Sequence, residues 1–207
     1  MAISSTGKQH VNLYQKLLLR RGILTRFPVL PGTALYLPYC GDGDLARECY
    51  ADREADLYAA DLDPLRVDTF RSRFPSATVK VADVEQWPFA EKDRPFGLAD
   101  FDAFGNPYLS VLSFWKAAKL SSRIVLFGTD GNLQTINRQR RLVEIPTNTG
   151  PVCRDVNTVR RHYNFWWTGH VLPWLMALIE GRGGKVAYKQ MYRRGSGMIY
   201  GGIVVER

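Results

Sequence analysis

Short apolar segments alternate with segments of helical pattern from Thr33 onward, and this alternation constrains the fold more than any other feature of the sequence. The helical segments are expected over residues 44–50, 64–74 and 107–120. Because strands separated by helices pair in parallel through right-handed crossovers, the pattern predicts a doubly wound α/β sheet. Its strands are expected over residues 33–38, 56–61, 77–82, 96–102 and 123–127.

The segments on either side of this alternation complete the predicted architecture. Residues 185–192 and 198–205 alternate as two strands around a short turn, which predicts an antiparallel hairpin at the end of the chain. Helices are expected over residues 10–24 and, with a tryptophan-rich face, over residues 159–181. Residues 129–157 form a polar insertion without a clear pattern. We therefore predict a single α/β domain with a mostly parallel seven-stranded sheet and a C-terminal antiparallel hairpin.

The composition indicates a soluble globular protein with a basic surface. Lys and Arg number 28 against 20 Asp and Glu, so the formal net charge is +8, and this balance favours polyanionic partners such as nucleic acid. No apolar run is long enough to span a bilayer and no secretory signal is recognisable, so we expect a cytoplasmic protein without a membrane partner. The three cysteines and three histidines are too scattered for a disulfide framework or a metal site.

Basic residues gather at three places in the sequence. Arginines contact phosphates and aromatic rings stack on bases, so these groups are candidates for binding nucleic acid. The alternative is that the arginines are solvated while the tryptophans pack a helix on the sheet. We favour packing for the tryptophans and leave both interpretations open for the arginines. The groups are Arg138, Arg140 and Arg141; Arg160, Arg161 and His162, followed by Phe165-Trp166-Trp167; and Arg193 with Arg194.

A glycine turn, Tyr-Cys-Gly-Asp-Gly over residues 39–43, follows the first expected strand. Glycine lets the backbone approach a ligand closely, and the helix that follows directs its N-terminus at the same point. Gly41 and Gly43 are therefore candidates for binding a cofactor. An ordinary tight turn would have the same sequence, so the motif has little specificity alone.

Acidic residues stand at the ends of the next two expected strands and make the glycine turn more specific. Asp61, followed by Leu62, ends the second strand, where an acid can accept both ribose hydroxyls of a nucleoside. Asp63 competes for this role, but its place before a proline is more typical of a helix N-cap. Asp83, followed by Val84, ends the third strand and could meet an adenine amine. Ligands in open α/β sheets bind at the carboxyl ends of the strands.

This arrangement resembles the class I SAM-dependent methyltransferases over residues 33–127. The resemblance implies S-adenosyl-L-methionine (SAM) as cofactor and transfer of its methyl group to a nucleophile. The family usually has an acid early in its first motif, where this chain has Leu37-Pro38, so the expected contact with the methionine part of SAM is weakened. The residues expected around SAM are Tyr39, Cys40, Gly41, Gly43, Asp61, Leu62, Asp83, Val84 and Asp100.

The end of the fourth expected strand carries a more specific resemblance. Residues 100–107, Asp-Phe-Asp-Ala-Phe-Gly-Asn-Pro, are similar to the Asp-hydrophobic-Asp-Pro-Phe-Gly-Ser-Pro run of tRNA guanosine N2-dimethyltransferases. Alanine replaces the first proline and asparagine replaces serine. In a second register, residues 106–108 would correspond to the Asn-Pro-Pro-Tyr motif with one proline missing. We prefer the first register because it matches over more residues. Either implies methylation of an exocyclic amine of a nucleic-acid base, in RNA or DNA.

Such an amine is a poor nucleophile because its lone pair is delocalised into the ring. A carboxylate or amide that accepts its N–H bonds favours attack and stabilises the developing positive charge, and an adjacent aromatic ring can stack on the extruded base. We therefore expect Asp102 to orient the amine with help from Asn106, while Phe104 and Tyr108 flank the base. Asp100, inside a central strand, must face the cleft or pair with an arginine; the sequence leaves this open.

Other interpretations stay open beside this one. Residues 102–107 could be a turn that leads into a helix. The chain could be a small-molecule methyltransferase or a non-catalytic binding subunit with a methyltransferase fold. A nucleotide-binding oxidoreductase is the least favoured, because the terminal hairpin and the segment around Asp102 would have no role in it. No separate RNA-binding domain is evident, which is compatible with a homo-oligomer or a partner subunit. Cys153 as a nucleophile for cytosine methylation is disfavoured, because a valine separates it from the preceding proline and it lies outside the fourth-strand loop.

Overall fold

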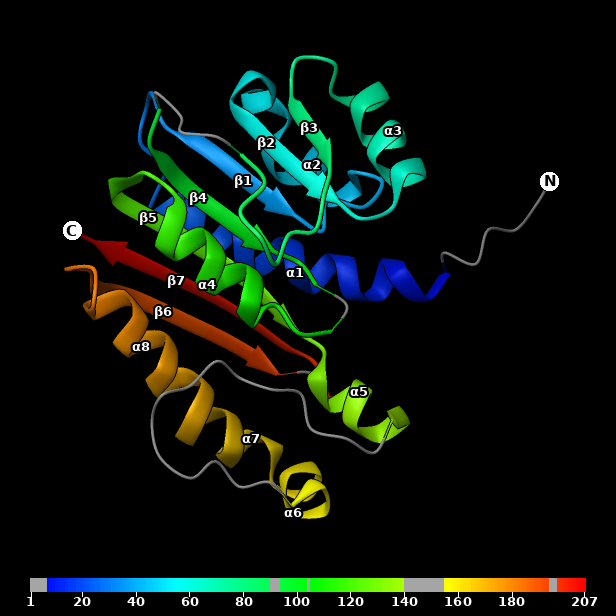
Figure 1. The fold of residues 1–207 in the computed structure, drawn as a ribbon, viewed down its shortest axis with the longest axis vertical. Helices are drawn as coiled ribbons and strands as arrows, with labels where there is room; N and C mark the ends of the chain where they lie inside the picture. The colour runs from blue at the N-terminus through cyan, green and yellow to red at the C-terminus, as the bar shows by residue number, and fades with distance from the viewer. Residues whose placement is uncertain (1–6, 90–93, 104, 140–154, 194–196) are drawn as a thin grey trace.

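The computed structural model describes residues 7–89, 94–103, 105–139, 155–193 and 197–207 (Figure 1). These residues contain a single sheet whose seven strands lie in the order β3-β2-β1-β4-β5-β7-β6. The first five are parallel, whereas β7 runs antiparallel to both β5 and β6. The prediction of a mostly parallel seven-stranded sheet with a C-terminal antiparallel hairpin is confirmed. The strands are β1 (Ala34–Pro38), β2 (Leu57–Asp61), β3 (Thr78–Val81), β4 (Phe96–Phe101), β5 (Leu120–Asp130), β6 (Lys185–Arg193) and β7 (Ile199–Glu206).

Helices cover both faces of this sheet (Figure 1). Successive side chains of a strand point to opposite faces, so Leu35 and Leu37 of β1 join one core cluster while Tyr36 joins the other. The first cluster packs under α1, α2 and α3, and the second under α4 to α8. The helices are α1 (Gly7–Arg26), α2 (Asp44–Tyr50), α3 (Pro64–Arg73), α4 (Tyr108–Ala117), α5 (Asn132–Gln139), α6 (Val156–Arg161), α7 (Tyr163–Trp166) and α8 (Leu172–Glu180), with a 3-10 helix η1 (Ala51–Asp56) and a π-helix η2 (Trp167–Val171).

The C-terminal helical region differs from the single helix predicted over residues 159–181. His162 ends α6 with non-helical dihedral angles, φ −116° and ψ 33°. Further on, the N–H of Leu172 bonds the oxygen of Trp167, five residues back, which is the π-helical pattern of η2. Pro173 follows directly and has no N–H to donate, so the normal ladder is interrupted at this point. The prediction of one continuous helix was wrong. The apolar pattern on which it was based runs through these interruptions unchanged, so it does not reveal them.

The stretch predicted as a polar insertion, residues 129–157, is partly regular structure. Strand β5 continues through Asp130, which pairs with Ile199 of β7, and α5 follows at Asn132. Residues 140–154, which include Arg140, Arg141 and Cys153, lie outside the described part of the chain. The fifth strand extends beyond its predicted end because its last residues pair with β7, about 70 residues further along the chain. These residues are polar, so their local pattern does not predict a strand.

The tryptophans of the C-terminal region belong to the core. Trp166, Trp167 and Trp174 are each at most 6% exposed, which agrees with the packing interpretation. The helix α1 begins at Gly7 and ends at Arg26, whereas the sequence predicts residues 10–24. No described helix is both long and apolar enough to cross a membrane.

Candidate active site

The bend after β1 turns the chain sharply at the carboxyl edge of the sheet. Tyr39, Gly41 and Gly43 all have positive φ, at 58°, 54° and 85°, a region in which glycine is far less strained than other residues. A Cβ atom on Gly41 would meet no atom within 4 Å, whereas one on Gly43 would lie 2.9 Å from the ring of Phe74. The bend therefore packs tightly against the end of α3 at Gly43 and leaves open space beside Gly41.

Asp61 at the end of β2 is tied directly to this bend. Its Oδ2 accepts a hydrogen bond from the N–H of Gly41 at 3.1 Å, and its Oδ1 accepts one from the N–H of Asp63 at 3.1 Å. Asp63 itself caps α3 by accepting from the N–H of Leu65 at 3.0 Å, as the N-cap interpretation predicts. The carboxylate at the second strand end therefore lies beside the backbone of the glycine bend.

The end of β3 adjoins the end of β2. The N–H of Ala82 donates to the backbone oxygen of Asp61 at 3.0 Å, so Asp83 follows one residue after this contact. The Asp83 carboxylate accepts from the N–H of Glu85 at 2.9 Å. Of the two apolar neighbours predicted to line the site, Leu62 is exposed and Val84 is buried. The bend and the two acidic strand ends thus form one continuous rim.

The end of β4 closes this rim on the other side of β1. A cavity between the two strands is lined by Tyr39 and Cys40 from the bend and by Asp100 and Asp102 from β4 and the residue just after it. Burial raises the pKa of the Cys40 thiol to about 12, so this cysteine stays protonated near neutral pH. The predicted cofactor residues of β1 and of β4 therefore face a shared space.

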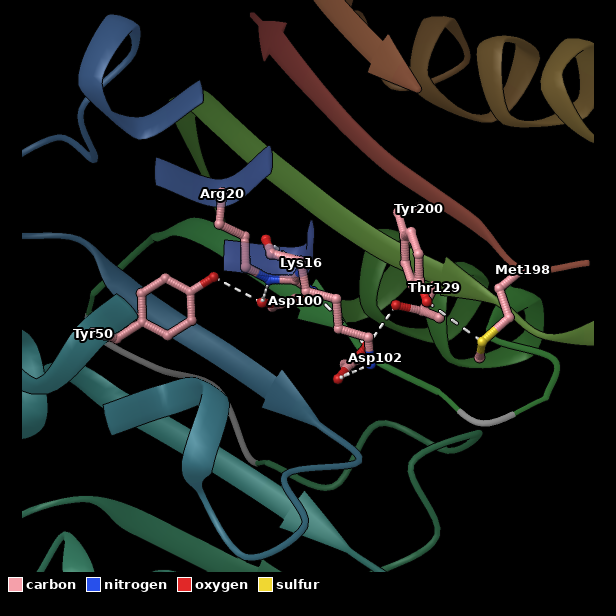
Figure 2. A network of polar contacts seen from close by, with 8 residues as sticks. All are labelled: Lys16, Arg20, Tyr50, Asp100, Asp102, Thr129, Met198 and Tyr200. Atoms are coloured by element: carbon pink, nitrogen blue, oxygen red, sulfur yellow. Dashed lines mark hydrogen bonds and ion pairs between the residues drawn. The ribbon is translucent and has the colours of Figure 1, made fainter. Parts of the chain in front are cut away.

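Asp100 is fully engaged inside the protein (Figure 2). Arg20 of α1 donates from Nε to Oδ2 at 2.6 Å and from Nη2 to Oδ1 at 2.5 Å, and the hydroxyl of Tyr50 donates to Oδ2 at 2.7 Å. Both side chains of the ion pair are 1% exposed. Burial alone would lower the pKa of Arg20, but Asp100 and Asp102 raise it above its ordinary value. The sequence left open whether Asp100 faces the cleft or pairs with an arginine; it borders the cavity and is paired with Arg20.

Asp102 forms a second, more accessible ion pair with the same helix (Figure 2). The Nζ of Lys16 lies 2.6 Å from Oδ1 and 2.7 Å from Oδ2, and the hydroxyl of Thr129 donates to Oδ1. Burial would raise the pKa of the Asp102 carboxyl, but Lys16, Arg20 and the hydrogen bonds lower it below its usual range. The side chains of Lys16 and Asp102 are 15% and 21% exposed. Asp102 is therefore ionised and already paired.

The remaining residues predicted at the acceptor site have structural partners. The side-chain oxygen of Asn106 accepts from the N–H of Tyr108 at 2.9 Å, at the start of α4. Tyr108 is buried, its hydroxyl donates to Asp130, and the indole N–H of Trp167 donates to that hydroxyl at 3.1 Å. The ring of Tyr108 thus lies in the core, so it does not flank a base as predicted. Phe104 lies outside the described residues.

A second, apolar cavity of about 70 Å³ lies between the sheet and the α4 and α8 helices. Trp167, Trp174 and Met191 line it, together with Tyr108 and Thr129. Because Thr129 also donates to Asp102, the hydroxyl of Thr129 and the Asp102 carboxylate stand between this cavity and the one beside the glycine bend.

This chain resembles known proteins in its fold but not in its sequence. No protein-family model and no curated protein matches this chain. The structure of the plantazolicin methyltransferase BpumL in complex with SAH matches with a TM-score of 0.62 at 12% identity, over 99% of this chain and 89% of that chain. The chain has the fold of class I methyltransferases.

Two further methyltransferases of this fold show how varied the group is. Magnesium protoporphyrin IX methyltransferase (ChlM) from Synechocystis PCC 6803 with bound SAH matches with a TM-score of 0.58 at 8% identity, over 100% of this chain and 88% of that chain. The N-methyltransferase NodS from Bradyrhizobium japonicum WM9 matches with a TM-score of 0.56 at 12% identity, over 99% of this chain and 100% of that chain. At these identities the likeness concerns the class I methyltransferase fold alone.

Four side chains that were not predicted as site residues bind residues that were: Lys16, Arg20, Thr129 and Asp130. Lys16 and Arg20 are four residues apart on the predicted N-terminal helix, a spacing that places both on one face, so this pair was detectable. Thr129 and Asp130 belong to the stretch predicted as an insertion. Their position at the end of β5 depends on pairing with β7, which no local pattern reveals.

Proposed function

We propose that the chain is a SAM-dependent N-methyltransferase that acts in the cytoplasm on an exocyclic amine of a nucleic-acid base. The observation that carries the proposal is the continuous rim at the carboxyl edge of the sheet. There the Asp61 carboxylate contacts the backbone of Gly41, the end of β3 adjoins it, and Asp102 faces the same cavity as the bend. Ligands of open α/β sheets bind at this edge.

The residues of the rim fit SAM in position and chemistry. The space beside Gly41 is open, and the Asp61 carboxylate next to it has further acceptor sites for ribose hydroxyls. Asp83 follows the backbone contact between Ala82 and Asp61, and we propose that Asp83 and the neighbouring Val84 lie on the adenine side of the site. SAM supplies the activated methyl group, and the protein binds it, orients the acceptor and excludes water.

The loop after β4 is the proposed site of the acceptor amine. It carries the resemblance to base N-methyltransferases, and the N–H of Gly131 anchors it by donating to the oxygen of Gly105 at 3.0 Å. The Asn106 side chain is used at the start of α4. The Asp102 carboxylate keeps capacity for one more N–H donor beyond Lys16 and Thr129, either from the acceptor or from the cofactor.

A nucleic-acid partner is supported by charge and by the surface near the end of β5. The exposed side chains of Arg161, His162 and Phe165 and the half-buried Arg160 lie on or next to α6, which contacts α5 directly after β5 (Figure 1). A strongly basic chain attracts phosphates, and an exposed ring such as Phe165 can stack on a base. NodS, of the same fold, is an N-methyltransferase, which is compatible with an amine acceptor.

Transfer of label from SAM to mixed nucleic acids tests the proposal. The purified protein is incubated with methyl-labelled SAM and pools of tRNA, ribosomal RNA and DNA, which are then digested to nucleosides. We expect label in an N-methylated nucleoside, loss of this label with Asp61→Asn, and retention with Arg21→Ala, a change at an exposed position of α1. SAM binding without label in any nucleoside would reject the acceptor class, and no SAM binding would favour a non-catalytic subunit.

The apolar cavity favours one second candidate, a methyltransferase for a small molecule with an apolar group. Trp167, Trp174 and Met191 would contact that group, and Thr129 would lie between it and Asp102. Binding of such an acceptor would not weaken strongly with added salt, whereas binding of nucleic acid would. The salt dependence of acceptor binding therefore separates the two candidates.

A further inference from the structure

Two ion pairs join α1 to the end of β4 in matched spacing. Lys16 and Arg20 are four residues apart on a helix, about 6 Å along its axis, and Asp102 and Asp100 are two residues apart on an extended segment, about 6.6 Å. The two cations therefore reach the two carboxylates side by side, as Figure 2 shows. We call Arg20–Asp100 the inner pair and Lys16–Asp102 the outer pair.

The two pairs differ in what they can still bind. The inner pair is 1% exposed on both sides, and Asp100 accepts three short bonds from Arg20 and Tyr50, so these partners enclose it. The outer pair is partly exposed. An ammonium has three donors and a carboxylate about four acceptor sites, and the outer pair uses only some of them between Lys16, Asp102 and Thr129.

The cavity beside the glycine bend lacks the acid that related folds place on β1. Leu37 and Pro38 stand there instead, and both line the cavity. Among the described residues that line it, only Asp100 and Asp102 carry a charge. Because the Asp100 side chain is 1% exposed whereas that of Asp102 is 21% exposed, Asp102 is the lining acid that a ligand can reach. Its lowered pKa keeps it ionised.

We infer that the outer pair binds the α-amino-acid end of SAM, with Asp102 accepting from its ammonium group and Lys16 donating to its carboxylate. An α-amino acid carries its ammonium and its carboxylate on the same carbon atom. It is therefore the electrostatic complement of a Lys–Asp pair. Asp102, just after β4, would take over the role of the missing β1 acid, and Lys16 of the N-terminal helix would add a contact to the carboxylate. The inference rests on the proposed use of SAM, and it assigns the spare acceptor site of Asp102 to the cofactor instead of the acceptor amine.

Binding of three adenosine ligands tests this assignment without any methyl acceptor. S-adenosylhomocysteine (SAH) carries both charges of the amino-acid end, decarboxylated SAM keeps only the ammonium, and 5′-methylthioadenosine has neither. Dissociation constants are measured by calorimetry for the unmodified chain, Lys16→Met, Asp102→Asn and the control Arg21→Ala, an exposed position on the same helix. Thermal unfolding of each variant shows whether the fold and the inner pair are kept.

The assignment predicts a pattern that depends on the ligand. Lys16→Met should weaken SAH by about 10-fold to 100-fold, the loss expected for a charge-assisted hydrogen bond. It should not weaken decarboxylated SAM, which is cationic, and should leave 5′-methylthioadenosine unchanged. Asp102→Asn should weaken SAH and decarboxylated SAM but not 5′-methylthioadenosine. Arg21→Ala should change none of them.

Two results would overturn the assignment. Equal losses of affinity for all three ligands would mean that the outer pair only supports the fold. Unchanged SAH binding in Asp102→Asn would mean that Asp102 does not bind the cofactor and remains a candidate for binding the acceptor amine. In both cases SAM use would stand, because the unmodified chain still binds SAH. Failure of the unmodified chain to bind any of the ligands would instead reject the proposed function together with the inference.

Discussion

Gly43 is the residue on which the shape of the bend depends most. Its φ is 85°, and a Cβ atom at this position would lie 2.9 Å from the ring of Phe74, so there is no room for a side chain. Gly41 beside it also has positive φ but faces open space. The two glycines therefore differ: Gly43 packs the bend onto the end of α3, and Gly41 borders open space.

Gly43→Ala should destabilise the fold by about 1–3 kcal/mol, through the cost of a positive φ and displacement of Phe74. Gly22→Ala is the matched control, because Gly22 lies within α1 and a Cβ there meets nothing within 4 Å. It should stabilise the protein by up to about 1 kcal/mol. Urea unfolding measures both changes, and equal effects of the two would contradict this account of the bend.

Asp130 is a buried carboxylate whose partners are neutral donors. Tyr163 donates to it at 2.7 Å and the N–H of Asn132 at 2.7 Å, with Tyr108 as a third donor. Burial raises the pKa of Asp130 above its ordinary value even though these hydrogen bonds act to lower it. The folded state therefore favours the protonated acid relative to the unfolded state.

The stability contributed by protonated Asp130 should be present below about pH 4, the unfolded pKa, and should be lost as the pH rises through the raised folded pKa. Asp130→Asn removes this titration. The free energy of unfolding of the variant, relative to that of the unmodified protein, should therefore rise from pH 4 to pH 7, by about 1.4 kcal/mol for each unit of pKa shift. A difference that stays constant across this range would refute the raised pKa.

At the scale of elements, α1 is fixed to β4 by the inner pair. Removing one partner leaves an uncompensated buried charge, so Arg20→Met or Asp100→Leu alone should cost about 3–5 kcal/mol. The double variant should cost much less than the sum, because two apolar side chains can pack in place of the pair. Denaturant unfolding of the three variants measures this coupling, and strictly additive losses would show that the pair is not the fixing contact.

The sequence was sufficient to predict the sheet because alternating strands and helices leave a local signal in every segment. The same holds for the glycine bend and for Asp61 and Asp63, whose places beside strand ends follow from short spacings. The pairing of Asp100 with Arg20 could not be predicted, since it joins residues 80 apart in the chain. The burial of Tyr108 could not be predicted either. Its hydroxyl contacts Asp130 and Trp167, which belong to elements later in the chain.

For the whole molecule, the net charge of +8 attracts polyanions at long range, and under the proposed function the arginines of α6 would contact phosphates directly. The Arg160→Ala, Arg161→Ala double variant should weaken nucleic-acid binding and lower the slope of log affinity against log salt by about 1.4–1.8, the share of two phosphate contacts. Fluorescence anisotropy over a salt series measures the slope. Lys185→Ala, Lys189→Ala on β6 removes the same charge from exposed positions and serves as the control; an equal change there would point to non-specific attraction.

The central claim is that the glycine bend and the acidic strand ends form a site for SAM. Calorimetric titration with SAH tests it most directly. The account predicts saturable binding of one SAH per chain and a loss of at least about 10-fold in affinity with Asp61→Asn, because this carboxylate would hold the ribose hydroxyls. Absence of SAH binding by the folded, unmodified chain, or binding that Asp61→Asn leaves unchanged, would contradict it.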